Sequence, residues 1–285
     1  MLWPAAFAWI VMAFAGTEDC DPSSLLHLMK PASLYGWDAD WPQDYNRAEI
    51  ESLVGDKATN SAVLQKQHAA GRARCQSGED VLESGGFCYT EEGQRLISTQ
   101  SSAVDEDFWL PKHHVMVEPG FASGLAKLVL KDSESVTDLG AGVGQLGHAL
   151  KAEHSNLRYY GYDGAGNVEE YTGGYVKFAN LGYPTNVAVS DWVVCLEVGE
   201  HIPHENEKSL IANIHAHNRK GVVLSWAHLL QAGHAHVNCH SAEYLRRVFE
   251  GLGYKYDNAT SQALRETVEG EQRFYRENVM IFRRP

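Results

Sequence analysis

One nine-residue stretch, residues 136–144, constrains the fold of this chain more than any other. It reads Val-Thr-Asp-Leu-Gly-Ala-Gly-Val-Gly, a short apolar run followed by Gly140, Gly142 and Gly144 at alternate positions. Glycine allows a backbone to turn tightly and a ligand to come close to it. The stretch therefore predicts a strand that enters a glycine-rich turn and opens a helix. Asp138 lies near the carboxyl end of that strand, which is the edge where an open α/β sheet binds its ligands.

Short apolar runs alternate with helical patterns from residue 118 to the end of the chain. Such alternation predicts βαβ units and a Rossmann-like, largely parallel sheet with helices on both faces. Strands are expected at residues 135–139, 157–163, 175–180, 192–196, 221–227, 254–257 and 274–283, and helices at 121–130, 145–153, 205–217 and 241–251. Only one short helix is expected between the last two strands, so these are predicted to form an antiparallel pair.

The region before this domain divides into two parts. Residues 1–16 are uncharged and apolar, too short for a comfortable membrane span of about 20 residues, and resemble a signal peptide or a short anchor. Residues 17–114 form an acidic extension, expected to be mainly helical and laid over the core, with a partly disordered arm as the open alternative. The domain with alternating strands and helices is then 115–285. A signal peptide would direct the chain to the secretory pathway, and without one the chain would be cytoplasmic.

The charge of the chain disfavours one class of partner. Its 285 residues carry a formal charge of −13, of which residues 17–110 contribute −10. An acidic surface repels phosphate backbones, so nucleic-acid binding is not expected, although a local basic patch would change this. The sequence does not indicate an oligomeric state.

The cysteines agree with an oxidising compartment. Cys75 and Cys88 flank a polar, glycine-rich loop that a disulfide would close. Cys20 would have no partner in this pairing. Cys195 lies in an apolar run typical of a buried thiol. Asn258 begins a glycosylation sequon, which matters only in the secretory pathway.

A second acid follows the glycine turn at an informative distance. Asp163 lies 25 residues after Asp138, at the end of the next expected strand. A carboxylate there can accept hydrogen bonds from both hydroxyls of a ribose. The glycine spacing departs from the dinucleotide pattern, in which the third glycine comes one residue later. A different nucleoside cofactor is therefore favoured over a dinucleotide.

These motifs resemble those of the class I S-adenosylmethionine-dependent methyltransferases over roughly residues 115–285. The resemblance rests on residues 138–144, 161–163 and 191–203. It implies a seven-stranded sheet with a reversed last strand, glycines 140, 142 and 144 facing the methionine part of the cofactor, and Asp163 holding the ribose. The third strand of such proteins often ends in an acid near the adenine. Asn180 stands there in this chain, so the adenine contact is unassigned.

Two carboxylates and an imidazole follow the expected strand 192–196. The Glu-x-x-Glu-His pattern of Glu197, Glu200 and His201 resembles the metal site of the small-RNA 3′-terminal 2′-O-methyltransferases and the ubiquinone-biosynthesis O-methyltransferases. The resemblance implies these three as ligands, with a further histidine from residues 228–240, either His234 or His236. Mixed oxygen and nitrogen ligands suit Mg²⁺, Mn²⁺ or Zn²⁺. Lining of the substrate pocket and a purely structural use stay open as alternatives.

Methyl transfer requires alignment of the acceptor and, for a hydroxyl, removal of a proton. His201 or His236 would serve as general base, or a metal would lower the pKa of the hydroxyl. We therefore expect a methyltransferase acting on oxygen of a small molecule or glycan. The alternatives are a metal-dependent RNA 2′-O-methyltransferase and a catalytically silent cofactor-binding module.

Overall fold

The computed structural model describes residues 45–77, 88–89, 93–95, 109–111, 118–229, 231, 236–270 and 273–285. The expected signal segment, Cys20 and His234 lie outside the described residues.

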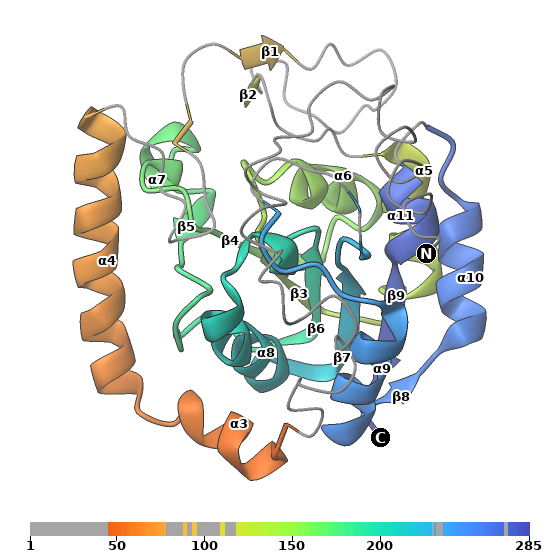
Figure 1. The fold of residues 1–285 in the computed structure, drawn as a ribbon. Coiled ribbons are helices and arrows are strands. Elements are labelled where there is room, and N and C mark those ends of the chain that lie inside the picture. Colours follow the sequence, from red (N-terminus) through yellow and green to blue (C-terminus); the bar gives the residue numbers. More distant parts are fainter. Residues whose placement is uncertain are drawn as a thin grey trace, which may run out of the picture.

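A seven-stranded sheet forms the centre of the molecule (Figure 1). Its strands, in spatial order, are β5 (Val176–Phe178), β4 (Arg158–Asp163), β3 (Ser135–Leu139), β6 (Ser190–Leu196), β7 (Asn218–Ser225), β9 (Met280–Arg283) and β8 (Lys255–Tyr256). The pairs from β5 to β7 are parallel, whereas β9 is antiparallel to both of its neighbours. This is the predicted Rossmann-like sheet with a reversed last strand. The strand order reverses direction between β3 and β6, and open α/β sheets bind ligands at the carboxyl ends of strands at such a point.

Helices cover both faces of the sheet, because each face is apolar. The helices α3 (Arg47–Leu53), α8 (Glu207–Ala216) and α9 (Ala242–Gly251) pack on one face with Val193 and Val222 of the strands. The helices α5 (Pro119–Leu128), α6 (Gln145–Glu153) and α10 (Asn258–Glu266) pack on the other with Val136, Val194 and Val223. Neighbouring residues of one strand face opposite sides, as the alternation of a strand requires.

Side-chain caps fix where several helices begin. Glu118 accepts a hydrogen bond from the backbone N–H of Phe121 at the start of α5, and Pro119 occupies the first turn. Ser241 and Asp257 cap α9 and α10 in the same way. Each cap satisfies an N–H group that has no partner within the helix.

The prediction for the last 30 residues was partly wrong. A strand was expected over 274–283, but its first half forms helix α11 (Arg273–Asn278), and only the second half is β9. The ring of Tyr275 stacks on Phe121 of α5 at 4.6 Å, a tertiary contact that local sequence does not specify. Two helices, α10 and α11, therefore separate β8 from β9. The final strand lies inside the sheet, between β7 and β8.

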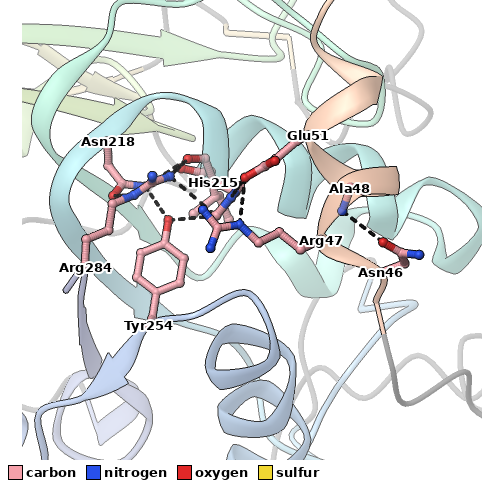
Figure 2. Close-up of polar contacts among 9 residues, drawn as sticks. Asn46, Arg47, Ala48, Glu51, His215, Asn218, Tyr254 and Arg284 are labelled. Atoms are coloured by element: carbon pink, nitrogen blue, oxygen red, sulfur yellow. Dashed lines mark hydrogen bonds and ion pairs between the residues drawn. The ribbon is translucent and has the colours of Figure 1, made fainter.

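The described part of the N-terminal extension packs against the core. Its two helices, α3 and α4 (Lys57–Ser77), agree with the expectation of a mainly helical extension. Figure 2 shows how α3 is attached: Glu51 accepts from Arg47 at 2.8 Å and lies 3.3 Å from Nε2 of His215 on α8. His215 in turn contacts Tyr254, whose hydroxyl also accepts from Asn218 at 2.7 Å.

The remaining elements are short. They comprise α7 (Val168–Tyr171), the 3₁₀ turns η2 (Gly199–His201) and η3 (His204–Asn206), and a small antiparallel pair, β1 (Gly93–Arg95) with β2 (Trp109–Pro111). The disulfide between Cys75 and Cys88 is present, and Cys195 is buried as predicted. Within the described ranges, every helix is too short or too polar to cross a membrane.

Candidate functional site

The three glycines after β3 form the turn that the sequence predicts. Gly140, Gly142 and Gly144 have φ angles of 81°, 60° and 88°, which side chains with a Cβ rarely adopt. A Cβ on Gly140 would also lie 2.2 Å from Val198, and one on Gly144 would lie 2.6 Å from Tyr175. Both the backbone conformation and the close packing therefore require glycine in this turn.

Asp163, at the end of β4, lies directly against this turn. Its Oδ2 accepts a hydrogen bond from the backbone N–H of Gly142 at 2.9 Å. Its Oδ1 accepts from the N–H of Ala165 at 2.9 Å and from the hydroxyl of Tyr89 at 3.1 Å. The fold thus brings the glycine turn and the acid expected for a ribose to the carboxyl edge of adjacent strands.

Asp138 is buried beneath the turn. Tyr159 donates a hydrogen bond to its Oδ2 at 2.7 Å. Burial raises the pKa of Asp138 to about 7, the nearby Asp163 also raises it, and the hydrogen bond from Tyr159 partly offsets both effects. This carboxyl group therefore titrates near neutral pH, unlike an exposed aspartate.

The turn after β6 carries the Glu-x-x-Glu-His residues. Glu197 has a φ of 51° and is the non-glycine residue with positive φ among the described residues. Its N–H donates to the hydroxyl of Ser225 on β7 at 3.0 Å. Two residues later, a Cβ on Gly199 would lie 2.3 Å from the indole of Trp226, so only glycine allows this close approach. A positive φ, as at Glu197, is uncommon for a residue other than glycine, and such residues cluster at functional sites.

Glu200 is fully buried, and neither of its carboxylate oxygens has a hydrogen-bond partner among the described residues. Burial raises its pKa well above the usual value, and the charge of Glu197 raises it further. The backbone N–H groups of Glu200 and Ala227 lower the pKa in part, but neither reaches the carboxylate with normal hydrogen-bond geometry. A buried carboxylate without donors is costly, so this group is suited to a cation.

His201 and His236 join Glu200 in one group. Each of the three offers a ligand atom, and these atoms lie within 4.8 Å of one another. The two imidazole rings meet edge to face, with centroids 5.0 Å apart. Nδ1 of His236 lies 3.0 Å from the carbonyl oxygen of Gln231, so this nitrogen must be the donor and Nε2 is the acceptor nitrogen of the ring. In that tautomer the hydrogen bond from Nδ1 to a carbonyl oxygen orients the ring and leaves Nε2 to bind a metal.

Glu197 lies beside this group without being a member of it. Its carboxylate accepts from Gln231 at 3.2 Å and from Asn278 at 3.4 Å. Burial raises the pKa of Glu197, while these donors and Ser225 lower it. Of the four residues predicted as metal ligands, the fold therefore groups Glu200, His201 and His236 and gives Glu197 other partners.

A buried carboxylate that sequence reasoning missed anchors the loop of His236. Glu207, at the start of α8, accepts from Asn238 at 2.8 Å and from His240 at 2.6 Å. The hydroxyls of Tyr45, at 2.6 Å, and Tyr244 donate to its other oxygen. Three of these partners lie within residues 238–244, and the fourth, Tyr45, comes from the N-terminal extension. Only the histidines of residues 228–240 gave a signal in the sequence.

Tyr89 is the second residue that sequence reasoning missed. It belongs to the N-terminal extension, 74 residues before Asp163, yet its hydroxyl donates to that carboxylate. The Cys75–Cys88 disulfide ends at the residue before it, and this was the one feature in the sequence that marked the segment.

A cavity of about 590 Å³ lies away from these residues. It is lined by Trp192 and by Lys220, Arg283 and other residues near the amino ends of β6 and β7. Lys220 pairs with Asp191 at 3.1 Å and Arg283 with Asp257 at 2.6 Å, so these cations already have partners. Asp163, Glu200 and His201 lie at the other edge of the sheet, where β4 and β6 end.

Comparison with known proteins finds methyltransferases among the similar structures. No protein-family model matches the chain, and no curated protein matches it. Magnesium protoporphyrin IX methyltransferase (ChlM) from Synechocystis PCC 6803, with bound S-adenosylmethionine, is 20% identical, covers 59% of this chain and 79% of its own, and has a TM-score of 0.43.

Two further structures are comparable. The plantazolicin methyltransferase BpumL, in complex with S-adenosylhomocysteine, is 10% identical, covers 59% of this chain and 83% of its own, and has a TM-score of 0.41. An O-methyltransferase family protein from Burkholderia thailandensis is 13% identical, covers 57% of this chain and 55% of its own, and also has a TM-score of 0.41. Each TM-score is below 0.5, so a function must be argued from the topology and contacts of this chain.

Proposed function

We propose that this chain is an S-adenosylmethionine-dependent methyltransferase that acts on a hydroxyl oxygen of a small molecule or glycan. One observation carries the proposal: Asp163 and the positive-φ glycine turn meet, through the 2.9 Å bond from Gly142, at the carboxyl edge of the sheet beside the point where the strand order reverses. Open α/β sheets bind their ligands at that edge. The spacing of the glycines and the reversed seventh strand favour this cofactor over a dinucleotide.

Glu200, His201 and His236 would hold a divalent cation in this enzyme. The donor-free, buried carboxylate of Glu200 fits a cation, and two imidazoles beside it suit Zn²⁺ or Mn²⁺ better than Mg²⁺, which prefers oxygen ligands. A bound cation would supply the Lewis acidity that lowers the pKa of an acceptor hydroxyl. The chain itself orients His236 through Gln231 and excludes water from Glu200.

The acceptor class rests on the compartment. The Cys75–Cys88 disulfide supports an oxidising environment and therefore a secretory location, in which glycans are abundant. Asn258 of the sequon is exposed at the start of α10. After expression in a secretory host, a glycosidase that removes N-linked glycans should increase the electrophoretic mobility of the wild-type chain and leave that of Asn258→Gln unchanged. Retention in the cytosol would count against the glycan proposal.

Calorimetry with S-adenosylmethionine tests the cofactor first. We expect one cofactor per chain, with at least about tenfold weaker binding in Asp163→Ala, because a carboxylate that accepts charge-assisted hydrogen bonds is lost. Tyr160→Phe, on the exposed side of the same strand, is the matched control and should bind normally. Absence of binding at millimolar cofactor would refute the proposal.

Transfer of a labelled methyl group to a panel of hydroxylated metabolites, glycans and short RNAs tests the acceptor. Labelling of a metabolite or glycan that a chelator abolishes and Zn²⁺ or Mn²⁺ restores would support the metal-dependent reaction. Activity that survives the chelator would assign His201 or His236 as general base instead. Labelling of RNA alone would favour the RNA 2′-O-methyltransferase.

A further inference from the structure

Tyr89 lies inside the cofactor half of the site, although it comes from the N-terminal extension. Its side chain is buried and packs in one apolar cluster with Ala141 and Val143 of the glycine turn and with Ala165 and Val168 after β4. The position of this ring is therefore defined by the same two turns that flank Asp163.

Polar contacts hold the backbone of Tyr89 in place. Asn167 accepts a hydrogen bond from the N–H of Tyr89 at 2.9 Å and donates one to its carbonyl oxygen at 2.7 Å. These two hydrogen bonds resemble the pair that joins opposite residues of two antiparallel strands. Tyr89 also packs against Tyr171, with ring centroids 5.2 Å apart.

A covalent link connects this contact to α4. The disulfide joins Cys88, the residue before Tyr89, to Cys75 near the end of α4. The helix itself approaches the segment after β4 so closely that a Cβ on Gly166 would lie 2.2 Å from the backbone of Gly71. His68 of α4 also stacks on Phe178 at the end of β5, with centroids 4.5 Å apart. Helix α4 and its disulfide therefore fix Tyr89 against the core.

The hydrogen bonds that Asp163 already accepts limit how it can bind the hydroxyls of a ribose without help from another residue. A carboxylate has about four lone-pair positions. The N–H groups of Gly142 and Ala165 and the hydroxyl of Tyr89 already donate to Asp163, and of these donors only Tyr89 can also accept a hydrogen bond. The two hydroxyls of a ribose need two acceptors. The phenol oxygen of Tyr89, whose proton goes to Asp163, is itself an acceptor at the same place.

We propose that Tyr89 and Asp163 together bind the ribose of the cofactor, each accepting one hydroxyl, and that the Cys75–Cys88 disulfide holds Tyr89 in this position. The inference rests on the proposed function. Burial and the charge of Asp163 raise the pKa of Tyr89, so its phenol keeps the proton that it donates. The extension is then part of the cofactor site, which a domain boundary near residue 115 would not include.

Calorimetry with S-adenosylhomocysteine and its 2′-deoxy and 3′-deoxy analogues tests the pairing. Tyr89→Phe removes one hydroxyl and should weaken binding of the full ligand about 3- to 10-fold, the effect of one hydrogen bond. Wild-type protein should lose affinity for both analogues. The Tyr89→Phe variant should no longer discriminate against one of them, while Tyr160→Phe should behave as the wild type. Unchanged or tighter binding of the full ligand by Tyr89→Phe would overturn the proposal.

A Cys75→Ser, Cys88→Ser double variant tests the disulfide. Its affinity for S-adenosylhomocysteine should fall several-fold while its circular dichroism spectrum stays that of the wild type, and addition of Tyr89→Phe should then cost less than in the wild type. Full additivity of the two changes would overturn the role of the disulfide. If wild-type protein binds and Asp163→Ala does not, but Tyr89→Phe is normal, this inference fails and the proposed function stands. If the wild type does not bind, the proposed function itself fails.

Discussion

Glu200 and Glu207 are the same residue type, seven positions apart, and both are fully buried, yet their surroundings are opposite. Glu207 accepts hydrogen bonds from two tyrosines, an asparagine and a histidine. Burial alone would raise its pKa, but contacts with His204, His240 and Tyr244 lower the pKa below its usual value. Glu200 has no hydrogen-bond partner among the described residues, and its pKa is raised. The number of donors, and not the burial, separates the two carboxylates.

The difference assigns different roles to the two residues. Glu207 is satisfied by the protein, so it joins α8, α9 and the loop of His236 into one unit. Glu200 receives no hydrogen bond from the described residues, so its carboxylate is suited to a cation. The two are linked, because the backbone carbonyl of Glu200 accepts from the N–H groups of Val237 at 2.7 Å and Asn238 at 3.1 Å, and the side chain of Asn238 donates to Glu207. One carboxylate thus fixes the loop that carries a ligand for the other.

The largest expected effect comes from exchanging each carboxylate for an amide. Glu207→Gln should lower the free energy of unfolding by about 3–5 kcal/mol, because it breaks a buried, charged network. Glu200→Gln should change that free energy by less than about 1 kcal/mol in metal-free protein, or increase it, since it removes a buried carboxylate without donors. Urea unfolding of both variants measures this. Equal destabilisation by Glu207→Gln and Glu200→Gln would contradict the different roles assigned to the two carboxylates.

Asp138, with a single donor, extends the comparison to pH. Its pKa of about 7 in the folded protein lies above the unfolded value of about 4, so folding favours its protonated form. Its contribution is fully present below pH 4 and is lost as pH rises toward 7, by at most about 4 kcal/mol. Stability measured from pH 4 to 8, with Asp138→Asn as reference, should show this loss in the wild type. The same pH dependence in Asp138→Asn would assign it to another group.

Removal of one donor from Glu207 should have the smallest effect. Tyr45→Phe leaves three hydrogen-bonded partners on that carboxylate and should cost about 0.5–1.5 kcal/mol of unfolding free energy. Tyr183→Phe, at an exposed position, is the control and should change stability by no more than about 0.5 kcal/mol. A loss for Tyr45→Phe as large as that for Glu207→Gln would show that the network has no redundancy.

Local sequence patterns predicted most of the fold. The strand at 135–139 and the helix at 145–153 match because alternating glycines and helical spacing are local signals. The region after residue 270 was predicted poorly, since the stacking of Tyr275 on Phe121 decides that 273–278 is helical. Contacts across more than 150 residues cannot be read from spacing.

The site shows the same division. Asp163 and the glycine turn are neighbours through adjacent strands, so the sequence placed them together correctly. Glu200, His201 and His236 were grouped by resemblance, and the fold brings these three together while giving Glu197 other partners. Tyr89 and Glu207 were missed because their partners lie 74 and up to 162 residues away. Whether the grouped residues bind a metal stays a prediction.

Calorimetric titration of Zn²⁺ and Mn²⁺ into the metal-free protein tests most directly whether the unsatisfied carboxylate of Glu200 binds a cation. The account predicts one ion per chain for the wild type and for Glu205→Gln, an exposed control in the same segment. Glu200→Gln should bind at least about 100-fold more weakly, because it loses the charged ligand of the group. Undiminished binding by Glu200→Gln, or no binding by the wild type at millimolar metal, would contradict it.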